Sequence, residues 1–255
     1  MRIKFFLENE KSKIVLPISY QQKLQAMIYK NLSPRIAEFI HDKGFLFEKR
    51  SFKMFCFSRI FGKHRINEKT KEIEFFSPIS FYLSTPYTIL AEDFTENIIK
   101  TENIKLGRTN LYLSSVEVFT KKIIKEELFI KMLSPLTMYS TFNKQSGEKI
   151  TYYYTPFDKE FGELIKRNII KKHKAFFDRD IEDKDFEIEP YIVSERKNLN
   201  IIYYKKILIK AWTGIYRLKG NRELLEFSYN SGIGAKNSQG FGMWEEWQQY
   251  NKKHT

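Results

Sequence analysis

The sequence predicts an α+β protein made of two tandem ferredoxin-like (RRM-like) domains, each with the element order βαββαβ. Three observations lead to this prediction. Hydrophobic periodicity gives that order once over residues 2–119 and again over residues 127–247. The length of 255 residues exceeds a minimal single core and suits two compact units. Hydrophobic residues make up 42% of the chain, which is enough apolar material for two cores.

In the first half, each element follows from its hydrophobic period and its flanking residues. We predict strands over residues 2–7, 51–58, 72–84 and 110–119, and helices over residues 18–32, 33–44 and 86–100. The lone cysteine, Cys56, lies between Phe55 and Phe57, which predicts a buried strand and an inert thiol. A single cysteine also excludes a disulfide framework and a multi-cysteine zinc site.

The second half repeats the order of the first. We predict a strand over residues 127–133, a tyrosine-rich extension to residue 155, a basic helix over 156–174, extended segments over 185–193 and 201–218, a short helix over 221–232 and a final strand over 241–247. The boundary is expected near residues 120–127, giving an N-terminal domain of residues 1–122 and a C-terminal domain of residues 123–255. No low-complexity linker separates the halves, so we expect them to dock closely.

The charge balance favours a polyanionic partner such as nucleic acid. Lys and Arg number 44 against 31 acidic residues, a net charge of +13, although a bias in base composition alone can produce such a total. Arg167, Lys171 and Lys174 recur at i, i+4 and i+7 on one face of the basic helix, opposite its apolar stripe. That spacing suits a helix that tracks phosphates, and it also suits a solvated helix face. The chain shows no signal peptide and no membrane-spanning stretch, which predicts a cytoplasmic protein.

A glycine-rich segment, NSGIGAKNSQGFGMW, precedes the last strand and contains Gly232, Gly234, Gly240 and Gly242. Nucleotide-binding glycine loops lie between a strand and a following helix, whereas here a helix enters and a strand leaves. What remains is a nearly bare ribbon with Lys236, Asn237, Ser238 and Gln239 at its middle. Its glycines permit positive φ and a close approach to phosphate oxygens. A turn that serves only packing is the alternative.

The segment GIGAKNSQGFGMW resembles the C-terminal glycine-rich signature of the CRISPR-associated endoribonucleases that cut repeat RNA, members of the RAMP superfamily. The signature has the form G-x-G-x-K-N-S-x-G-F-G, and every fixed position is present. The segments MRIKFFLENE, LQAMIYKNLSP and AEFIHDKG resemble the family's N-terminal half, so the resemblance covers essentially the whole chain. It implies a metal-independent endoribonuclease without cofactors that binds CRISPR repeat RNA and cleaves precursor transcripts into guide RNAs. We expect the basic helix face and the loop residues to bind RNA: Arg167, Lys171, Lys174, Gly232, Gly234, Lys236, Asn237, Ser238, Gln239 and Gly240.

The same resemblance implies Tyr29, His41 and Lys53 as catalytic residues. Cleavage would proceed by attack of the 2′-hydroxyl on the adjacent phosphorus, giving a 2′,3′-cyclic phosphate and a 5′-hydroxyl. His41 would carry the proton transfers. Tyr29 would orient the 2′-hydroxyl or the phosphate, and Lys53 would offset developing charge. Sequence position alone does not single out Lys53, since Lys43, Lys49 and Arg50 lie close in the sequence.

The helical geometry of this region can be tested against that expectation. If residues 19–42 formed one straight helix, Tyr29 and His41 would lie about 18 Å apart along its axis. Proline disfavours helical geometry at the preceding residue, and serine at N-cap with proline at N1 starts a new helix. The Ser33-Pro34 pair therefore predicts two helices that fold back. Both Tyr29 and His41 lie off the apolar stripes of their helices.

The remaining histidines, His64, His173 and His254, have no metal-ligand partner at i+3 or i+4, so we expect them to face solvent. Tyrosines 152–154 and 203–204 either stack on unpaired bases or pack inward. Two other functions stay open: a non-catalytic RNA-binding subunit of the same superfamily, and a metal-dependent nuclease. Other subunits of a guide-RNA effector complex are further candidate partners, and both a monomer and a homodimer are compatible with the sequence.

Overall fold

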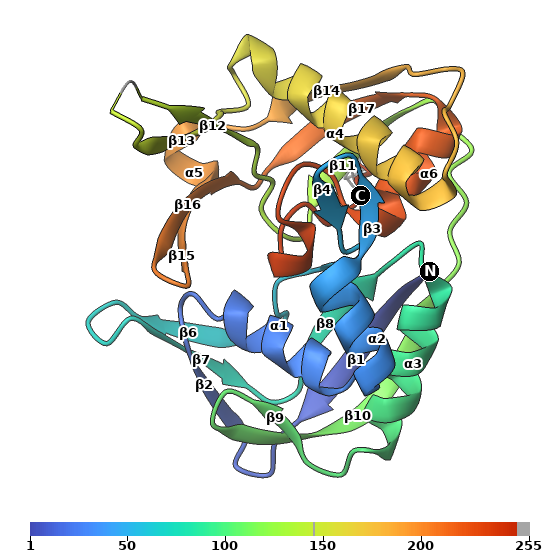
Figure 1. Cartoon of the computed structure of the whole chain (residues 1–255). Helices are drawn as coiled ribbons and strands as arrows, with labels where there is room; N and C mark the ends of the chain where they lie inside the picture. Colours follow the sequence, from blue (N-terminus) through green and yellow to red (C-terminus); the bar gives the residue numbers. More distant parts are fainter. Residues whose placement is uncertain (145, 249–255) are drawn as a thin grey trace, which may run out of the picture.

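The computed structural model describes residues 1–144 and 146–248, so His254 lies outside the described residues. Figure 1 shows two layered halves, one above the other, with most of the blue-to-green first half below and the yellow-to-red second half above. Each half packs helices against its own antiparallel sheet. No helix in the described part of the chain is long and apolar enough to cross a membrane.

The first half is built on a five-stranded sheet in the order β5-β8-β1-β10-β9. The strands are β1 (Arg2–Glu8), β5 (Cys56–Phe57), β8 (Ile79–Ser84), β9 (Ile104–Leu106) and β10 (Thr109–Phe119). The helices are α1 (Gln21–Lys30), α2 (Pro34–Glu38), the π-helical turn η1 (Phe39–Lys43) and α3 (Thr88–Lys100). Counting β1, β5, β8 and β10 as the first to fourth strands of the motif, their order across the sheet is 4-1-3-2.

The second half has a four-stranded sheet in the order β14-β17-β11-β18. Its strands are β11 (Glu127–Met132), β14 (Phe186–Ile192), β17 (Ile215–Gly220) and β18 (Trp244–Glu246), and its main helices are α4 (Lys159–Phe177) and α6 (Arg222–Ser231). The order is again 4-1-3-2, and all pairings are antiparallel. The predicted tandem ferredoxin-like fold is confirmed in both halves.

Three predicted continuous strands are wrong, because each contains a break that the hydrophobic pattern hides. The segment 51–58 divides at Met54, which has positive φ (53°), into β4 (Arg50–Phe52) and β5. The segment 72–84 divides at Ser77 and Pro78 into β7 (Glu72–Phe76) and β8, since proline cannot donate to a sheet ladder. The segment 201–218 divides into β15 (Leu199–Tyr204), β16 (Ile207–Trp212) and β17. The structure adds small elements around the two sheets: β2 (Lys13–Pro17), β3 (Phe45–Phe47), β4 (Arg50–Phe52), β6 (His64–Asn67), β12 (Tyr139–Asn143), β13 (Lys149–Tyr153), α5 (Glu195–Asn198) and η2 (Asn237–Gln239).

Each half has its own apolar core, and Cys56 is fully buried as predicted. In the first core, the Phe5 ring lies 5.4 Å from that of Phe81 and 5.0 Å from that of Phe94. Burial raises the pKa of the Cys56 thiol to about 11, so the thiol stays protonated and inert at neutral pH. Packing of aromatic rings therefore fixes β1 and β8 beneath α3.

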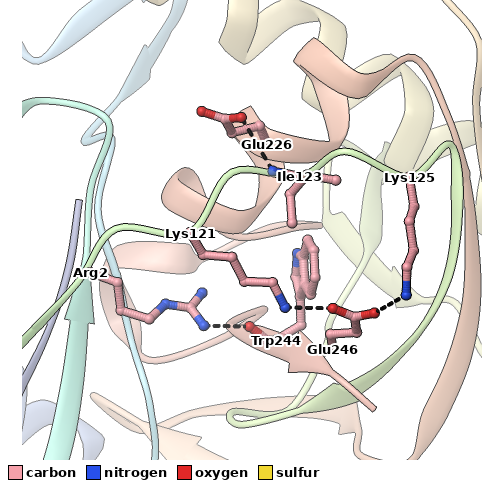
Figure 2. Close-up of polar contacts among 7 residues, drawn as sticks. All are labelled: Arg2, Lys121, Ile123, Lys125, Glu226, Trp244 and Glu246. Atoms are coloured by element: carbon pink, nitrogen blue, oxygen red, sulfur yellow. Dashed lines mark hydrogen bonds and ion pairs between the residues drawn. The ribbon is translucent and has the colours of Figure 1, made fainter. Parts of the chain in front are cut away.

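The two halves are fastened together by β1 and by the segment after β10 (Figure 2). The buried Arg2 guanidinium donates to the carbonyls of Trp244 and Tyr229, at 2.7 Å each. Lys121 and Lys125 both bind the Glu246 carboxylate, at 2.6 and 2.7 Å. The predicted close docking is confirmed by these contacts. The boundary at residue 122 stays a prediction.

Candidate active site

The helical segment after β2 breaks where the sequence predicts. Helix α1 ends at Lys30, Ser33 has extended geometry (φ −59°, ψ 150°), and Pro34 is the first residue of α2. The Ser33 amide donates to the Asp93 carboxylate on α3 at 2.8 Å, which anchors the turn, while the serine hydroxyl makes no capping bond. The predicted second α-helix is only partly correct. It changes after Glu38 into a π-helical turn that carries His41.

The turned-back pair brings Tyr29 and His41 together. Their ring centroids lie 6.0 Å apart with the planes at 85°. The Lys53 ammonium donates to the main-chain carbonyl of His41 at 2.6 Å. All three side chains line one cavity of about 350 Å³ between the two halves. The prediction that the Ser33-Pro34 break places the phenol beside the imidazole is confirmed, and their catalytic roles stay a prediction.

The protonation of these groups sets what they can do. Burial raises the pKa of Tyr29 to about 12, with the nearby Tyr204 hydroxyl adding to the rise, so Tyr29 is a neutral phenol that can donate a hydrogen bond. The Nδ1 atom of His41 lies 2.6 Å from the Asp42 carboxylate, which leaves Nε2 for other partners. Partial burial lowers the pKa of Lys53, and Asp42 opposes that shift.

Lys53 is also distinguished from its basic neighbours by position. Of the four cations considered from sequence, only Lys53 lines the cavity with Tyr29 and His41. Arg50 lines a second, adjoining cavity, and Lys43 and Lys49 line neither. Lys53 lies in both cavities, so it stands at the junction between them.

The second cavity has a volume of about 700 Å³ and is strongly basic. Six cations line it: Arg50, Lys53, Arg167, Lys171, Lys172 and Lys236. Among the described residues no carboxylate lines it, and none of these six side chains forms a salt bridge. Five of these side chains are unpaired cations that attract a polyanion; Lys172 is the exception, because burial lowers its pKa to about 7.

The predicted basic helix face is divided by the structure. Arg167 and Lys171 line the larger cavity. Lys174 lies outside both cavities, and its ammonium binds Asp180 at 2.8 Å. The predicted RNA-binding role is therefore better supported for the first two residues than for the third.

The glycines of the glycine-rich segment pack against other residues of the protein. A Cβ atom added at Gly240 would lie 2.5 Å from the Phe57 ring, and one added at Gly234 would lie 2.6 Å from the Leu136 side chain and from the Thr137 carbonyl. Both residues have positive φ, at 88° and 70°. The backbone here must pass close to both halves, which is the packing alternative. Gly232 packs in the same way, against Asn237 and Cys56. RNA binding by these glycines stays a prediction.

The polar residues of the segment have two kinds of position. The Asn237 amide donates to the carbonyls of Ile233 and Phe241, at 2.9 and 3.1 Å, and so holds the loop closed. The side chains of Lys236 and Ser238 line both cavities, and Gln239 lines the smaller one. Burial lowers the pKa of Lys236, whose ammonium lies 4.7 Å from the centre of the Tyr139 ring. Their predicted contact with RNA remains open.

Lys172 is a residue that sequence reasoning missed. It is buried, and its ammonium donates to the Gly232 carbonyl and, at 3.0 Å, to the Asn237 side chain. Burial lowers its pKa to about 7. Lys172 follows the apolar residues Ile165 and Ile169 at helical spacing, so it lies beside the apolar stripe of α4. A lysine at such a position was the one signal in the sequence that could have marked it.

One histidine expectation is wrong. His173 is fully buried, and its Nε2 atom lies 2.8 Å from the Glu223 carboxylate, because α4 packs against α6 at this point. His64 is exposed on β6 as predicted.

The tyrosines divide between the two alternatives of base stacking and inward packing: Tyr152 and Tyr203 are exposed, whereas Tyr204 is buried.

The fold and the site define a tandem ferredoxin-like protein with a basic cavity and, beside it, a smaller cavity lined by Tyr29 and His41. The family model "CRISPR associated protein Cas6, C-terminal" matches residues 118–246, and "CRISPR-associated protein Cas6, N-terminal" matches residues 15–117. The chain therefore belongs to the Cas6 family of CRISPR-associated proteins, which confirms the predicted family.

Individual relatives agree with that assignment. CRISPR-associated endoribonuclease Cas6 1 of Methanocaldococcus jannaschii is 26% identical over 99% of this chain and 96% of its own. CRISPR-associated endoribonuclease Cas6 of Pyrococcus furiosus is 27% identical, over 94% and 87%. The solved structure of a Cas6-related protein from Pyrococcus furiosus superposes with a TM-score of 0.84 at 23% identity, covering 98% of this chain and 99% of that one, which supports the fold.

Proposed function

We propose that this protein is an endoribonuclease that binds CRISPR repeat RNA and cleaves precursor transcripts into guide RNAs without a metal ion. The observation that carries the proposal is the meeting of Tyr29, His41 and Lys53 in one cavity, next to a larger basic cavity. Acid-base groups at the edge of a cationic hollow suit a phosphodiester that must be held and cut in place. Two relatives of near full-length coverage carry the name endoribonuclease.

In the proposed reaction, the 2′-oxygen bonds to phosphorus while the bond from phosphorus to the 5′-oxygen breaks. The proton leaves the 2′-hydroxyl and a proton reaches the 5′-oxygen, so no net charge is gained. His41 Nε2 moves these protons, because Nδ1 is held by Asp42. Tyr29, protonated at neutral pH, donates to the phosphate or orients the 2′-hydroxyl. Lys53 offsets the charge that develops on the phosphorane.

The test is incubation with labelled CRISPR repeat RNA from the source organism's own array, in the presence of EDTA. We expect cleavage at one position, with a product that ends in a 2′,3′-cyclic phosphate and a second product with a 5′-hydroxyl. Loss of cleavage in EDTA, restored by added metal, would favour a metal-dependent nuclease and contradict the proposal.

A non-catalytic RNA-binding subunit is the second candidate. The larger basic cavity favours binding whether or not the chemistry occurs, since its six cations lie mostly outside the cavity of Tyr29 and His41. A gel shift with intact RNA and no cleavage under any metal condition would favour this candidate. The proposal of an endoribonuclease also includes a cytoplasmic location and association with other subunits of a guide-RNA complex. It is compatible with a monomer and with a dimer. Size-exclusion chromatography with and without RNA tests the oligomeric state.

A further inference from the structure

The hairpin formed by β15 and β16 reaches from the second half to the candidate active site of the first. Tyr204, Lys205 and two isoleucines of this hairpin line the cavity that holds Tyr29 and His41. The hairpin was not predicted, because residues 201–218 were expected to form one extended segment. The hairpin therefore forms one side of the cavity, and it belongs to the C-terminal half.

The hairpin is held in place by specific contacts with the first half. The Tyr204 hydroxyl bonds the Gln25 side chain, whose amide nitrogen donates to the Ser238 carbonyl at 2.7 Å. The Tyr203 amide donates to the Ser19 hydroxyl at 3.2 Å. Gln25 lies one helical turn before Tyr29 on α1, so it ties the hairpin and the glycine-rich segment to the helix that carries Tyr29.

The tip of the hairpin has an unfavourable sequence for its geometry. Tyr204 pairs with Ile207, which leaves Lys205 and Lys206 as a two-residue loop, and both have positive φ, 47° and 68°. Such a type I′ turn prefers Asn-Gly, because side chains at positive φ meet the backbone. Eight of the described non-glycine residues have positive φ, and Lys205 and Lys206 are the only two of the eight that are consecutive in the sequence. Strain of this kind collects at functional sites.

The cavity also has the charge that an RNA phosphate needs. Lys53, Lys205 and Lys236 line it from three separate connecting segments, and no carboxylate of the described residues lines it. Lys205 is exposed and forms no salt bridge with a described residue. Its ammonium is free to meet an anion that occupies the cavity.

We propose that Lys205 contacts the RNA phosphate at or beside the cleaved linkage, so that the C-terminal half supplies a substrate-binding residue to the active site. This inference rests on the proposed function. It explains why a lysine occupies the first position of a turn at which asparagine would be more favourable. Its ligand is a phosphate of single-stranded RNA that enters between the hairpin and α1.

The experiment separates turn strain from charge. In the double variant Lys205→Asn with Lys206→Gly, the turn becomes the preferred Asn-Gly, and we expect Tm to rise by about 2–4 °C. We expect the single-turnover cleavage rate of the repeat RNA to fall by about tenfold or more, since a positioned phosphate contact is lost. Stability and activity thus change in opposite directions, which a damaged fold cannot produce.

Two single variants complete the test. Lys206→Gly relieves strain but keeps Lys205, so its cleavage rate should match the wild type. Lys205→Arg keeps the charge and should retain most of the activity. Equal cleavage rates and equal RNA affinities for the double variant and the wild type would overturn the inference, as would a loss of activity in Lys206→Gly equal to that of the double variant.

The wild-type protein serves as the reference for the proposed function. If it cleaves, the Lys205 variants are compared by rate. If it binds repeat RNA without cleaving it, the proposed function fails, and Lys205 is judged by affinity alone. A lower affinity of the double variant than of Lys206→Gly for the intact repeat RNA then supports the contact, and equal affinities of these two variants remove it.

Discussion

The two halves share one strand order and use the same topological position differently. The position is the helical connection between the first and second strands of each motif. In the first half it breaks after α1 (Gln21–Lys30) and turns back through α2 and η1. In the second half it is one continuous helix of 19 residues, about 28 Å long. The broken connection brings two side chains together, and the continuous one presents a row of cations.

This difference shows that the fold alone does not assign the function. A bend of a few residues converts a connection into a site where Tyr29 and His41 meet, with ring centroids 6.0 Å apart. The straight helix α4 instead places Arg167 and Lys171 along the wall of the larger cavity. The first half thus supplies the Tyr29–His41 pair and the second supplies most of the cations of the larger cavity, while the β15–β16 hairpin lines the smaller cavity from the second half.

The largest effect on RNA cleavage is expected at His41, which lies in the broken helical connection of the first half. The His41→Ala variant should lose cleavage by about 10²–10⁴-fold, because the proton transfers lose their carrier, while its affinity for repeat RNA stays near that of the wild type. Single-turnover kinetics and filter binding measure the two quantities. His64→Ala, a change at an exposed histidine of the same half, is the matched control and should cleave normally. Cleavage by His41→Ala at the wild-type rate would remove the assignment.

A second prediction concerns the close packing of Gly240, in the glycine-rich segment of the second half, against Phe57 of the first half. Gly240→Val should lower the free energy of unfolding by about 3 kcal/mol, since it adds backbone strain at positive φ to overpacking against Phe57. Urea denaturation measures the change. Gly147→Val is the control, because Gly147 also has positive φ but no described atom lies within 4 Å of its added Cβ. Its smaller loss reports strain alone, and equal losses would contradict a packing role for Gly240.

A third prediction uses the pH dependence of stability and concerns Lys172. Its pKa in the folded state is about 7, below the ordinary 10.5, so above pH 7 the unfolded chain binds more protons than the folded one. Stability contributed by this group therefore rises with pH between about 7 and 9, by up to about 1.4 kcal/mol per pH unit. Denaturation at several pH values measures the slope. In Lys172→Met the slope should flatten, and an unchanged slope would assign it to other groups.

The smallest effects are expected for the cations of α4. Arg167→Ala and Lys171→Ala should each weaken RNA binding by several-fold and reduce the salt slope of the association constant by about 0.7–1, since each removes one phosphate contact. Lys174→Ala should change both quantities less, because Lys174 is already bound to Asp180. Affinity titrations at four salt concentrations make this comparison. Three equal effects would mean that RNA follows the whole helix face.

Several features of the site were predictable because their causes are local. The Ser33-Pro34 pair acts on the backbone of its immediate neighbours, so the bend could be predicted from two residues. The apolar stripe of α1 depends on helical period, and the residues at that spacing, Tyr20, Leu24, Met27 and Ile28, are all buried. The glycine-rich segment could be recognised because its fixed residues are contiguous.

Other features could not be predicted, because they depend on which segments meet in space. His173 was expected to face solvent and is buried against Glu223, since only the packing of α4 on α6 hides it. The turn at Lys205 and Lys206 carries no glycine or asparagine, so its sequence gives no turn signal. Ligand contact by the individual loop residues also remains a prediction.

The amino-acid sequence by itself determined the two motifs, the break between the first helices, the positive charge and the family, because hydrophobic period, proline geometry and contiguous motifs act over short stretches of chain. Only the tertiary structure decided which cations share a cavity, that Lys172 is buried beside the loop, and that a hairpin of one half closes the site of the other. Those features arise from residues up to about two hundred positions apart in the chain, such as Gln25 and Tyr204, whose side chains meet only when both cores have packed.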